Sequence, residues 1–366
     1  MQHNDHKTVL TLDAGGTNFV FSAIRGGEEI AVPITMPAHP DNLKKCLAAI
    51  VAGFRELINA VGTAPDAISF AFPGPADYIN GVIGDLPNFP AFRGGVALGP
   101  YLEMIFRLPV FINNDGNLFA YGEAYAGALP RVNELLREAG SSRLYRNLIG
   151  VTLGTGFGCG VVVDNRLLLG DNGCGGDLWN MTNKKYPEMI VEESVSIRAV
   201  KRVYQELSGI DAAALSPKDI FEVAEGLRPG DQQAAISSFR ELGEMAGDAL
   251  IRALNIVDGV IVVGGGLAGA ARYILPGMTD EMNRQLHTFS GHSFPCLQMK
   301  VFNLLDEEGI KSFLKEDASG ITLPFSAQQV RYANQKKTAV TLSALGTNRA
   351  VSLGAYAFAL SKLNSR

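Results

Sequence analysis

Three glycine-rich turns, each directly after an apolar run, are the segments of this 366-residue chain with the clearest chemical potential. They span Asp13 to Asn18, Gly154 to Gly160 and Gly264 to Gly269. A glycine turn after a buried strand brings backbone N–H groups close to a ligand with no side chains in the way. Clustered N–H groups favour anions such as phosphate. A tight structural turn is the alternative interpretation of any one of them taken alone.

The third turn, GGGLAG, has the GxGxxG spacing of a dinucleotide-binding turn between a strand and a helix. That pattern also requires a second strand ending in an acid about 20 residues further on. Asp280 and Glu281 come too early for this role and lie in a helical stretch. The chain has no GxxxxGKS or GxxxxGKT sequence, which excludes a P-loop. The turn therefore favours neither a Rossmann oxidoreductase nor a P-loop enzyme.

The first two turns carry side chains that a purely structural turn does not need, namely Asp13, Thr17 and Thr155. An acid at the end of a buried strand is costly unless it is hydrogen-bonded or faces a cation. Magnesium prefers a carboxylate, waters and phosphate oxygens, and would remove that cost. The combination predicts a magnesium-bound nucleotide, with Asp13 holding the ion through its waters.

A second polar group follows the apolar run that ends at Ile112, in the sequence INNDGN. Asp115 could accept a proton from a substrate hydroxyl, while Asn114 fixes the geometry of that hydroxyl. The alternative is a helix N-cap, with Asp115 or Asn117 opening the helix that follows. Only the surrounding pattern distinguishes the two interpretations.

Apolar runs alternate with stretches of helical spacing, which predicts an α/β fold. The predicted strands are 8–13, 19–24, 67–72, 109–113 and 259–263, and the predicted helices are 43–61, 117–128, 195–207, 219–225, 234–254 and 348–363. The strand, glycine turn and strand of the N-terminus recur at Asn147 to Leu168, which predicts two related lobes. The polar segment Gln328 to Thr338 fits either a hairpin or a loop.

Composition sets the broad class. With 47% hydrophobic residues, 19% charged residues and a formal net charge of -5, the chain has no basic footprint for nucleic acid. Its four cysteines are too scattered for a disulfide framework or a zinc ribbon, so we expect reduced thiols in a cytoplasmic protein. No apolar stretch of about 18 or more residues appears, so we expect no membrane segment. The length exceeds what one core usually supports, which also predicts two lobes.

Taken together, eight stretches in this order resemble the ROK family of sugar kinases and repressors, within the actin, hexokinase and Hsp70 type of fold. They are DAGGTN (13–18), FPGPAD (72–77), LPNFP (86–90), INNDGN (112–117), LGTGFGCG (153–160), GGDLWN (175–180), VVGGGLA (262–268) and ALGTNRAVSLGAY (344–356). The resemblance runs through nearly the whole chain and is far more specific than any single turn.

The resemblance implies an α/β, two-lobed actin-like or ribonuclease H-like ATPase fold, in which each lobe is a mixed sheet flanked by helices. The small lobe would be residues 1–123, completed by the C-terminal helix 348–366. The large lobe would be residues 124–347, with insertions near 130–146 and 300–340. These insertions are possible dimer contacts, and we expect a homodimer.

The implied activity is ATP-dependent phosphorylation of a hexose or amino-hexose hydroxyl, with Mg²⁺ and with Asp115 as the general base. Catalysis would rest on positioning and electrostatics in a cleft that closes between the lobes. The residues implied to bind the ATP phosphates and Mg²⁺ are Asp13, Gly15, Gly16, Thr17, Asn18, Gly154, Thr155 and Gly156. Those implied to bind adenosine are Gly264, Gly265 and Gly266. Those implied to bind the sugar are Asn88, Asn114, Asp115, Asp177, Asn180 and Glu192.

The chain departs from the family pattern at the sugar loop. Asp177 and Asn180 stand where the family commonly has glutamate and histidine, and the family's cysteine-rich zinc segment is absent, so we expect no zinc site. Aspartate is one methylene shorter and can still accept hydroxyl hydrogen bonds. Trp179 would either stack on the sugar ring or be a buried packing residue. Glu192 is the predicted third acidic sugar ligand, with Glu193 as its alternative.

The ROK resemblance also allows a DNA-binding repressor or a non-catalytic sugar-binding protein. About a dozen residues precede Asp13, too few for the helix-turn-helix of a repressor, and the charge does not suit DNA. A non-catalytic sugar-binding or regulatory protein is favoured by the altered sugar loop. The intact Asp13, Thr17 and Asp115 and both phosphate turns oppose it, and favour an active kinase.

Overall fold

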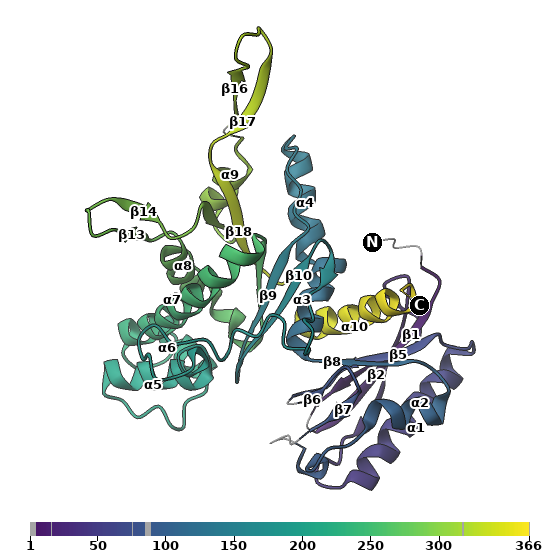
Figure 1. The fold of residues 1–366 in the computed structure, drawn as a ribbon. Helices are drawn as coiled ribbons and strands as arrows, with labels where there is room; N and C mark the ends of the chain where they lie inside the picture. The colour runs from purple at the N-terminus through teal and green to yellow at the C-terminus, as the bar shows by residue number, and fades with distance from the viewer. Residues whose placement is uncertain (1–4, 16, 75, 85–88, 317, 366) are drawn as a thin grey trace. The chain divides into compact units, whose positions relative to one another are not determined.

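The computed structural model describes residues 5–15, 17–74, 76–84, 89–316 and 318–365 (Figure 1). Gly16 and Asn88, two of the predicted site residues, lie outside this part of the chain. The chain forms two compact units. Unit 1 comprises residues 1–128, 159–176 and 343–366, and unit 2 comprises residues 129–158 and 177–342.

The sheet of unit 1 has the strand order β3-β2-β1-β5-β8, and β4 also pairs with β2. Its strands are β1 (Thr8–Ala14), β2 (Asn18–Arg25), β3 (Glu28–Glu29), β4 (Ile34–Pro37), β5 (Ala67–Ala71) and β8 (Val110–Asn113). β1 pairs antiparallel with β2 and parallel with β5, which in turn pairs parallel with β8. A short antiparallel pair, β6 (Ala76–Asp77) and β7 (Val82–Ile83), stands apart from this sheet.

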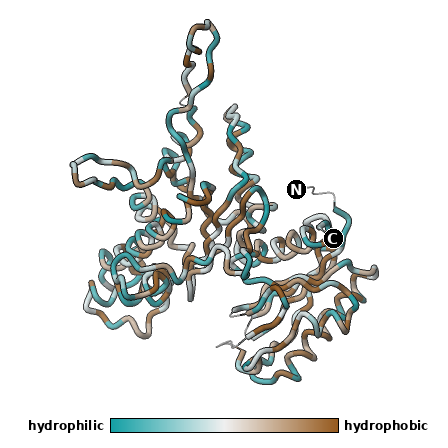
Figure 2. Tube along the Cα trace, viewed as in Figure 1, coloured by the Kyte–Doolittle hydropathy of each residue, from teal (hydrophilic) through white to brown (hydrophobic). Residues whose placement is uncertain are grey.

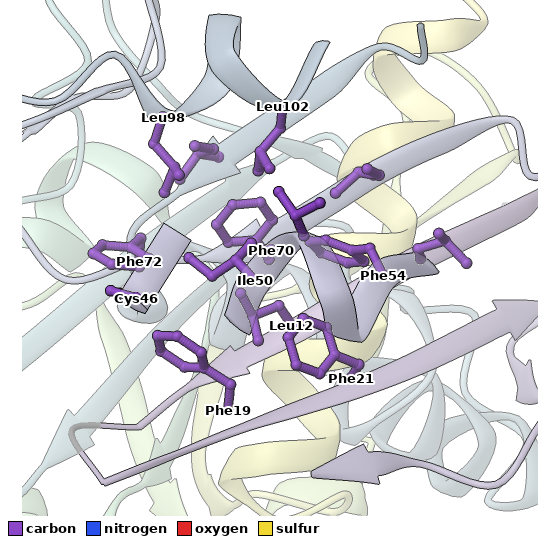
Figure 3. Close-up of a cluster of buried hydrophobic side chains, with 14 of the residues drawn as sticks. Leu12, Phe19, Phe21, Cys46, Ile50, Phe54, Phe70, Phe72, Leu98 and Leu102 are labelled. Atoms are coloured by element: carbon purple, nitrogen blue, oxygen red, sulfur yellow. The ribbon is translucent and has the colours of Figure 1, made fainter. Parts of the chain in front are cut away.

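Phenylalanines form the core between this sheet and two helices, α1 (Leu43–Val61) and α2 (Leu98–Phe106). Phe21 and Phe54 meet edge to face with ring centroids 5.0 Å apart, and Phe70 lies beside them (Figure 3). The sequence defines α1 at both ends. Asn42 caps its first turn by accepting the Lys45 N–H, and Gly62 ends it in the left-handed conformation.

Helices α3 (Asp115–Tyr125) and α10 (Thr347–Leu363) pack closely against each other in the same unit. Glycines make this approach possible, because a Cβ on Gly354 would lie 1.8 Å from the Leu118 carbonyl oxygen. A Cβ on Gly122 would lie 1.9 Å from the Ala350 carbonyl oxygen. α10 also contacts β1 and β5, so the last helix of the chain packs on the first strands.

The second sheet has the order β11-β10-β9-β12-β18-β15, and the boundary between the units falls within β10. Its strands are β9 (Leu148–Leu153), β10 (Phe157–Val163), β11 (Arg166–Leu167), β12 (Val260–Gly264), β15 (Met299–Asn303) and β18 (Lys336–Leu342). β9, β12, β18 and β15 run parallel. The central strands of both sheets are strongly hydrophobic (Figure 2).

The helices of unit 2 are α4 (Ala128–Glu138), α5 (Ile197–Ser208), α6 (Pro217–Ala224), α7 (Gln232–Val257), α8 (Ala271–Met282) and α9 (Glu307–Leu314). Short 3₁₀ segments in the described residues are η1 (Pro90–Phe92) in unit 1 and η2 (Val191–Glu193) and η3 (Gly266–Ala270) in unit 2. Two hairpins extend from unit 2, one of β13 (Gln285–His287) and β14 (Ser293–Pro295), the other of β16 (Ala318–Thr322) and β17 (Gln329–Ala333) (Figure 1).

The α/β prediction is confirmed, and the helix predicted over 43–61 has the predicted ends. The helix predicted over 117–128 corresponds to α3, which begins two residues earlier and ends at Tyr125. Ala128, the last residue of the predicted range, is already the first residue of α4. The segment Gln328 to Thr338 contains β17, which pairs with β16, and the start of β18, which pairs with β12 and β15, so it supplies one strand of a hairpin and is not a hairpin by itself. Within the described ranges, no helix is both long and apolar enough to cross a bilayer.

Candidate active site

The carboxyl ends of three parallel strands of unit 1 form one row. Asp13 in β1 pairs with Ala71 in β5, and Ala71 pairs with Asn113 in β8. Neighbouring strands lie about 4.8 Å apart, so Asp13 and Asn113 are about 10 Å from each other along this edge. The first glycine turn and the INNDGN segment therefore leave the sheet at the same edge.

The Asp13 turn passes close to its own backbone at Gly15. A Cβ on Gly15 would lie 2.8 Å from the Asn18 carbonyl oxygen, so the β1–β2 turn tolerates no side chain there. Thr17 and Asn18 are exposed, and the Thr17 carbonyl accepts the Ala38 N–H at 2.9 Å. Asp13 reaches solvent, yet partial desolvation raises the pKa of its carboxyl. A carboxylate held this way is stabilised by a cation, so the turn fits magnesium and phosphate.

At the end of β8, the asparagines organise the start of α3. The Asn114 side chain is the N-cap and accepts the Asn117 N–H at 2.6 Å. The Asn113 side chain accepts the Asn114 N–H at 2.8 Å and the Asn117 amide at 3.0 Å. The alternative that Asp115 or Asn117 caps the helix is wrong, because Asn114 already occupies that position.

Asp115 is therefore released from capping. It is the first residue of α3, and its side chain is exposed. One of its oxygens accepts the N–H of the adjacent Gly116 at 3.0 Å. A carboxylate at a helix N-terminus, held on a rigid strand end and open to solvent, can accept a proton from a bound hydroxyl.

In unit 2, the second and third glycine turns lie next to each other. β9 and β12 pair in parallel, with Thr152 opposite Gly264, so both strands end at the same edge of the sheet. Gly265 has φ +88°, and a Cβ on it would lie 2.4 Å from the Leu153 carbonyl oxygen. Glycine is required at this position by both the backbone conformation and the close approach.

The second turn is tied to the start of α5. The Gly154 carbonyl accepts the Ile197 N–H at 2.8 Å, and the Thr155 carbonyl accepts the Arg198 guanidinium at 3.2 Å. Nothing lies within 4 Å of where a Cβ on Gly154 would stand. Within this turn the Gly154 N–H donates to the Gly156 carbonyl at 3.1 Å, so the N–H groups of Thr155 and Gly156 are the candidates for binding a phosphate.

Glu192 lies against the same turn. Its Oε2 accepts the Phe157 N–H at 3.0 Å and would lie 2.7 Å from a Cβ on Gly156. Its Oε1 lies 3.5 Å from the Arg198 guanidinium, which also pairs with Glu193 at 2.9 Å. Sequence reasoning missed Arg198. Glu192 lies in η2 and Arg198 in α5, so no spacing within a single helix could have indicated this contact.

The sugar loop joins this group through its backbone. The Trp179 carbonyl accepts the Glu192 N–H at 3.2 Å. Burial raises the pKa of the Asp177 carboxyl, and a hydrogen bond from the Trp179 side chain partly offsets that rise. The Trp179 side chain is 41% exposed, so it is not the buried packing residue of the second interpretation, and Asn180 is exposed too.

Ser196, at the N-cap of α5, is completely buried, and no hydrogen-bond partner of its Oγ appears among the described residues. In the same part of the chain, no three His, Cys, Asp or Glu side chains are grouped so as to hold a metal ion. Asp13 offers one carboxylate to a magnesium ion at the first turn, which suits an ion held mainly by waters and phosphate.

This chain is similar in sequence and in structure to known proteins. The profile of the ROK family matches residues 9–311. A glucokinase of Thermotoga maritima is 26% identical over 296 residues, covering 75% of this chain and 86% of the relative. The crystal structure of a glucokinase from Parabacteroides distasonis is 58% identical, covers 99% of both chains and superposes with a TM-score of 0.88.

A ROK family glucokinase from Streptomyces griseus, solved with glucose and AMPPNP, is 18% identical and has a TM-score of 0.59 over 95% of this chain and 98% of the other. At that identity it shows the fold alone. Sheets flanked by helices, shared with these kinases, define an actin-like ATPase fold. The chain belongs to the ROK family. Within that family it is a carbohydrate kinase.

Proposed function

We propose that the protein transfers the γ-phosphoryl group of ATP to a hydroxyl of a hexose or amino-hexose, with glucose as the first sugar to test. The observation that carries this proposal is the state of Asp115. Its carboxylate is exposed at the first position of α3, where Asn114 provides the cap, and it follows β8, whose last residue Asn113 lies in one row with Asp13. The glucokinases of Thermotoga maritima and Parabacteroides distasonis support glucose.

Asp115 acts as the general base. It accepts the proton of the sugar hydroxyl as the hydroxyl oxygen attacks the γ-phosphorus, and ADP leaves as the bond to the β-phosphate oxygen breaks. Asn114 orients that hydroxyl, with Asn88 as a further sugar contact. Because little covalent chemistry falls to the protein, its main contributions are positioning and the stabilisation of charge.

Two glycine turns hold the ATP phosphates. In unit 1 the backbone of the segment from Asp13 to Asn18, including Gly15, Gly16 and Thr17, offers its N–H groups. In unit 2 Gly154, Thr155 and Gly156 do the same, and Gly264 to Gly266 face the adenosine. Bound magnesium would neutralise charge on the phosphates. Asp13 holds that ion through its waters, and a cation there would offset the desolvation that raises the pKa of its carboxyl.

Three side chains of unit 2 complete the sugar site. Asp177 and Glu192 accept sugar hydroxyls, and Asn180 adds a polar contact. The Oε2 of Glu192 is already engaged by the Phe157 N–H, so its Oε1, near Arg198, is the oxygen that faces the sugar. This shared contact couples the sugar ligand Glu192 to the phosphate turn.

We further propose that the working protein is a cytoplasmic homodimer. Its functional lobes are residues 1–123, completed by the helix 348–366, and residues 124–347. Limited proteolysis with and without glucose tests that division. Glucose should protect cleavage sites near residues 123–124 and 347–348, where the chain passes from one lobe to the other, and not sites within either lobe.

The deciding experiment replaces the base. In a coupled ADP-release assay over a panel of hexoses and amino-hexoses, we expect Asp115→Asn to lower kcat by about 10²- to 10⁴-fold, the usual contribution of a general base. The fold should survive, since Asp115 is exposed and makes one local hydrogen bond. Asp211→Asn, an exposed aspartate that likewise accepts one nearby N–H, is the matched control and should keep full activity.

Unchanged turnover in Asp115→Asn would rule out its role as base. Absence of turnover by the wild-type protein on every sugar, with sugar binding intact, would instead identify a non-catalytic sugar-binding protein. The replaced sugar-loop residues Asp177 and Asn180 are the feature that favours this second outcome.

A further inference from the structure

The two hairpins of unit 2 expose large apolar side chains in the same arrangement. In β13–β14, Leu286 pairs with Phe294 across the strands, and Phe289 at the tip is fully exposed. In β16–β17, Ile321 pairs with Val330, and Phe325 at the tip is fully exposed. Figure 1 shows both hairpins reaching away from the sheet and helices of their unit, and Figure 2 shows hydrophobic segments along them.

The pairing register gives the longer hairpin, β16–β17, one apolar face. Side chains alternate along a strand, so Ile321 shares its face with Ser319, and Val330 shares that face with Tyr332. Leu323 continues the same side, and its N–H is bonded to the Gln328 carbonyl at 2.8 Å. Ile321, Val330 and Tyr332 are each 50% exposed.

The opposite face of this hairpin is small or polar. It carries Gly320 opposite Arg331 and Thr322 opposite Gln329. The tip residue Phe325 has φ +58°, which is unusual for a bulky side chain and directs the ring out of the turn. The hairpin is thus amphipathic, although nothing in the described part of its own chain covers the apolar face.

Such an element needs a partner. A lone two-stranded hairpin is marginally stable in water, and both of its outer edges carry unpaired backbone groups. Its five apolar side chains, Ile321, Leu323, Phe325, Val330 and Tyr332, leave roughly 600 Å² exposed if a fully exposed large side chain counts about 200 Å². That is most of the roughly 800 Å² that each partner contributes to a standard interface.

Charge indicates which partner fits. In the segment from Ala318 to Ala333 the only charged residue is Arg331, and it is paired with Glu316. A surface without net charge can meet an identical copy about a two-fold axis without bringing like charges together. A partner chosen by charge complementarity would find nothing here to recognise.

We propose that the β16–β17 hairpin is a dimerisation arm whose occupant is the same apolar face of a second copy of this chain. The two faces pack through Ile321, Val330 and Tyr332, with Phe325 of each arm buried at the end of the other. This inference rests on the homodimer put forward with the proposed function and names its surface.

The test is the mass in solution, measured by sedimentation velocity between about 0.1 and 100 μM. The wild-type chain should sediment at twice its 39.1 kDa mass. The triple variant I321T/V330T/Y332T keeps strand-forming residues while removing the apolar face, and should raise the dimer dissociation constant at least 100-fold. The variant T322S/Q329T changes the opposite face equally close by and should remain dimeric.

Three results would overturn the proposal: a wild-type monomer at 100 μM, a triple variant that stays dimeric, or dissociation caused by Phe294→Thr in the other hairpin and not by the triple variant. Hydrogen exchange needs no variant. The amides of residues 318–333 should exchange more slowly at 100 μM than at a dilution low enough to lower the sedimentation mass toward 39.1 kDa, and equal rates at these two concentrations would contradict the arm. Kinase turnover is measured in a separate assay. A protein that phosphorylates no sugar would contradict the proposed function, whereas a protein that does not dimerise through β16–β17 would contradict only the dimerisation arm.

Discussion

Glu192 lies 35 residues from Phe157 in the sequence, yet its carboxylate accepts the Phe157 N–H and faces Gly156. A single side chain thus connects the predicted sugar ligands to the predicted phosphate turn. Arg198 completes the link by bonding the Thr155 carbonyl and pairing with both glutamates. A methyl group at position 156 would lie 2.7 Å from the Glu192 Oε2, so a side chain there would displace the Glu192 carboxylate.

Asp177 offers a pH-dependent prediction at the same scale. Burial raises its pKa, so it gains a proton at a higher pH than an ordinary aspartate does. A protonated carboxyl is a poorer acceptor of sugar hydroxyls, so the KM for glucose should rise as the pH falls toward this raised pKa. Asp177→Asn should raise KM about 10-fold at pH 7.5, the loss of roughly one hydrogen bond to a charged group, and should abolish the acid-side rise.

The measurement is KM against pH from 5 to 8 for wild type and variant, with Asp211→Asn as the control. An unchanged acid-side rise in Asp177→Asn would assign the titration to another group. KM rises on the acid side because sugar binding needs the ionised Asp177 carboxylate. The raised pKa of Asp177 moves this rise to a higher pH than an ordinary aspartate would give.

At the scale of elements, each sheet has a parallel strand that ends at a glycine turn. The contact that excludes a side chain differs between them, because Gly15 meets Asn18 of its own turn and Gly265 meets Leu153 of the neighbouring strand β9. The strands are continuous apolar runs because both of their faces are buried, which is why they were readable from sequence.

Gly265→Ala tests the turn between β12 and η3. The added methyl would lie 2.4 Å from the Leu153 carbonyl oxygen, and φ +88° would be strained. We expect a loss of about 2 to 3 kcal/mol in the free energy of unfolding and a higher KM for ATP. Gly269→Ala in the same 3₁₀ segment is the matched control, since nothing lies within 4 Å of its Cβ.

Denaturant unfolding of both variants is the check. If Gly265→Ala unfolds at the same denaturant concentration as Gly269→Ala, then the turn adapts and the close approach to β9 is not a constraint. A stable Gly265→Ala with a raised KM for ATP would separate the binding role from the structural one.

At the scale of the whole chain, Glu123 binds two segments next to the boundaries of unit 1, one at Ala128 and one at 343–345. Its buried carboxylate accepts the Ala128 N–H at 2.6 Å and the Leu345 N–H at 3.2 Å, with Ser343 and Ala344 as further donors. The unit boundaries follow Ala128 and precede Ser343. One side chain thus fixes the end of α3 against the segment that enters α10.

Glu123→Gln should therefore destabilise the protein by about 3 kcal/mol, because an amide group would turn an N–H toward donors that need an acceptor. Thermal unfolding measures this, and Glu138→Gln at the exposed end of α4 is the control. A melting temperature within about 1 °C of the control would show that the donors find other acceptors.

The sequence by itself determined the α/β class, the central strands β1, β2, β5, β8 and β12, the glycine turns, the extent of α1 and the ROK resemblance, because these depend on apolar periodicity and turn chemistry within a few neighbouring residues. Only the tertiary structure decided that Asn114 caps α3 and leaves Asp115 exposed, since all of the polar residues there suit a cap. It alone brought Glu192 and Arg198 to the second turn and gave β16–β17 its apolar face. Contacts across tens of residues and strand registers depend on how whole elements pack, and no local pattern encodes them.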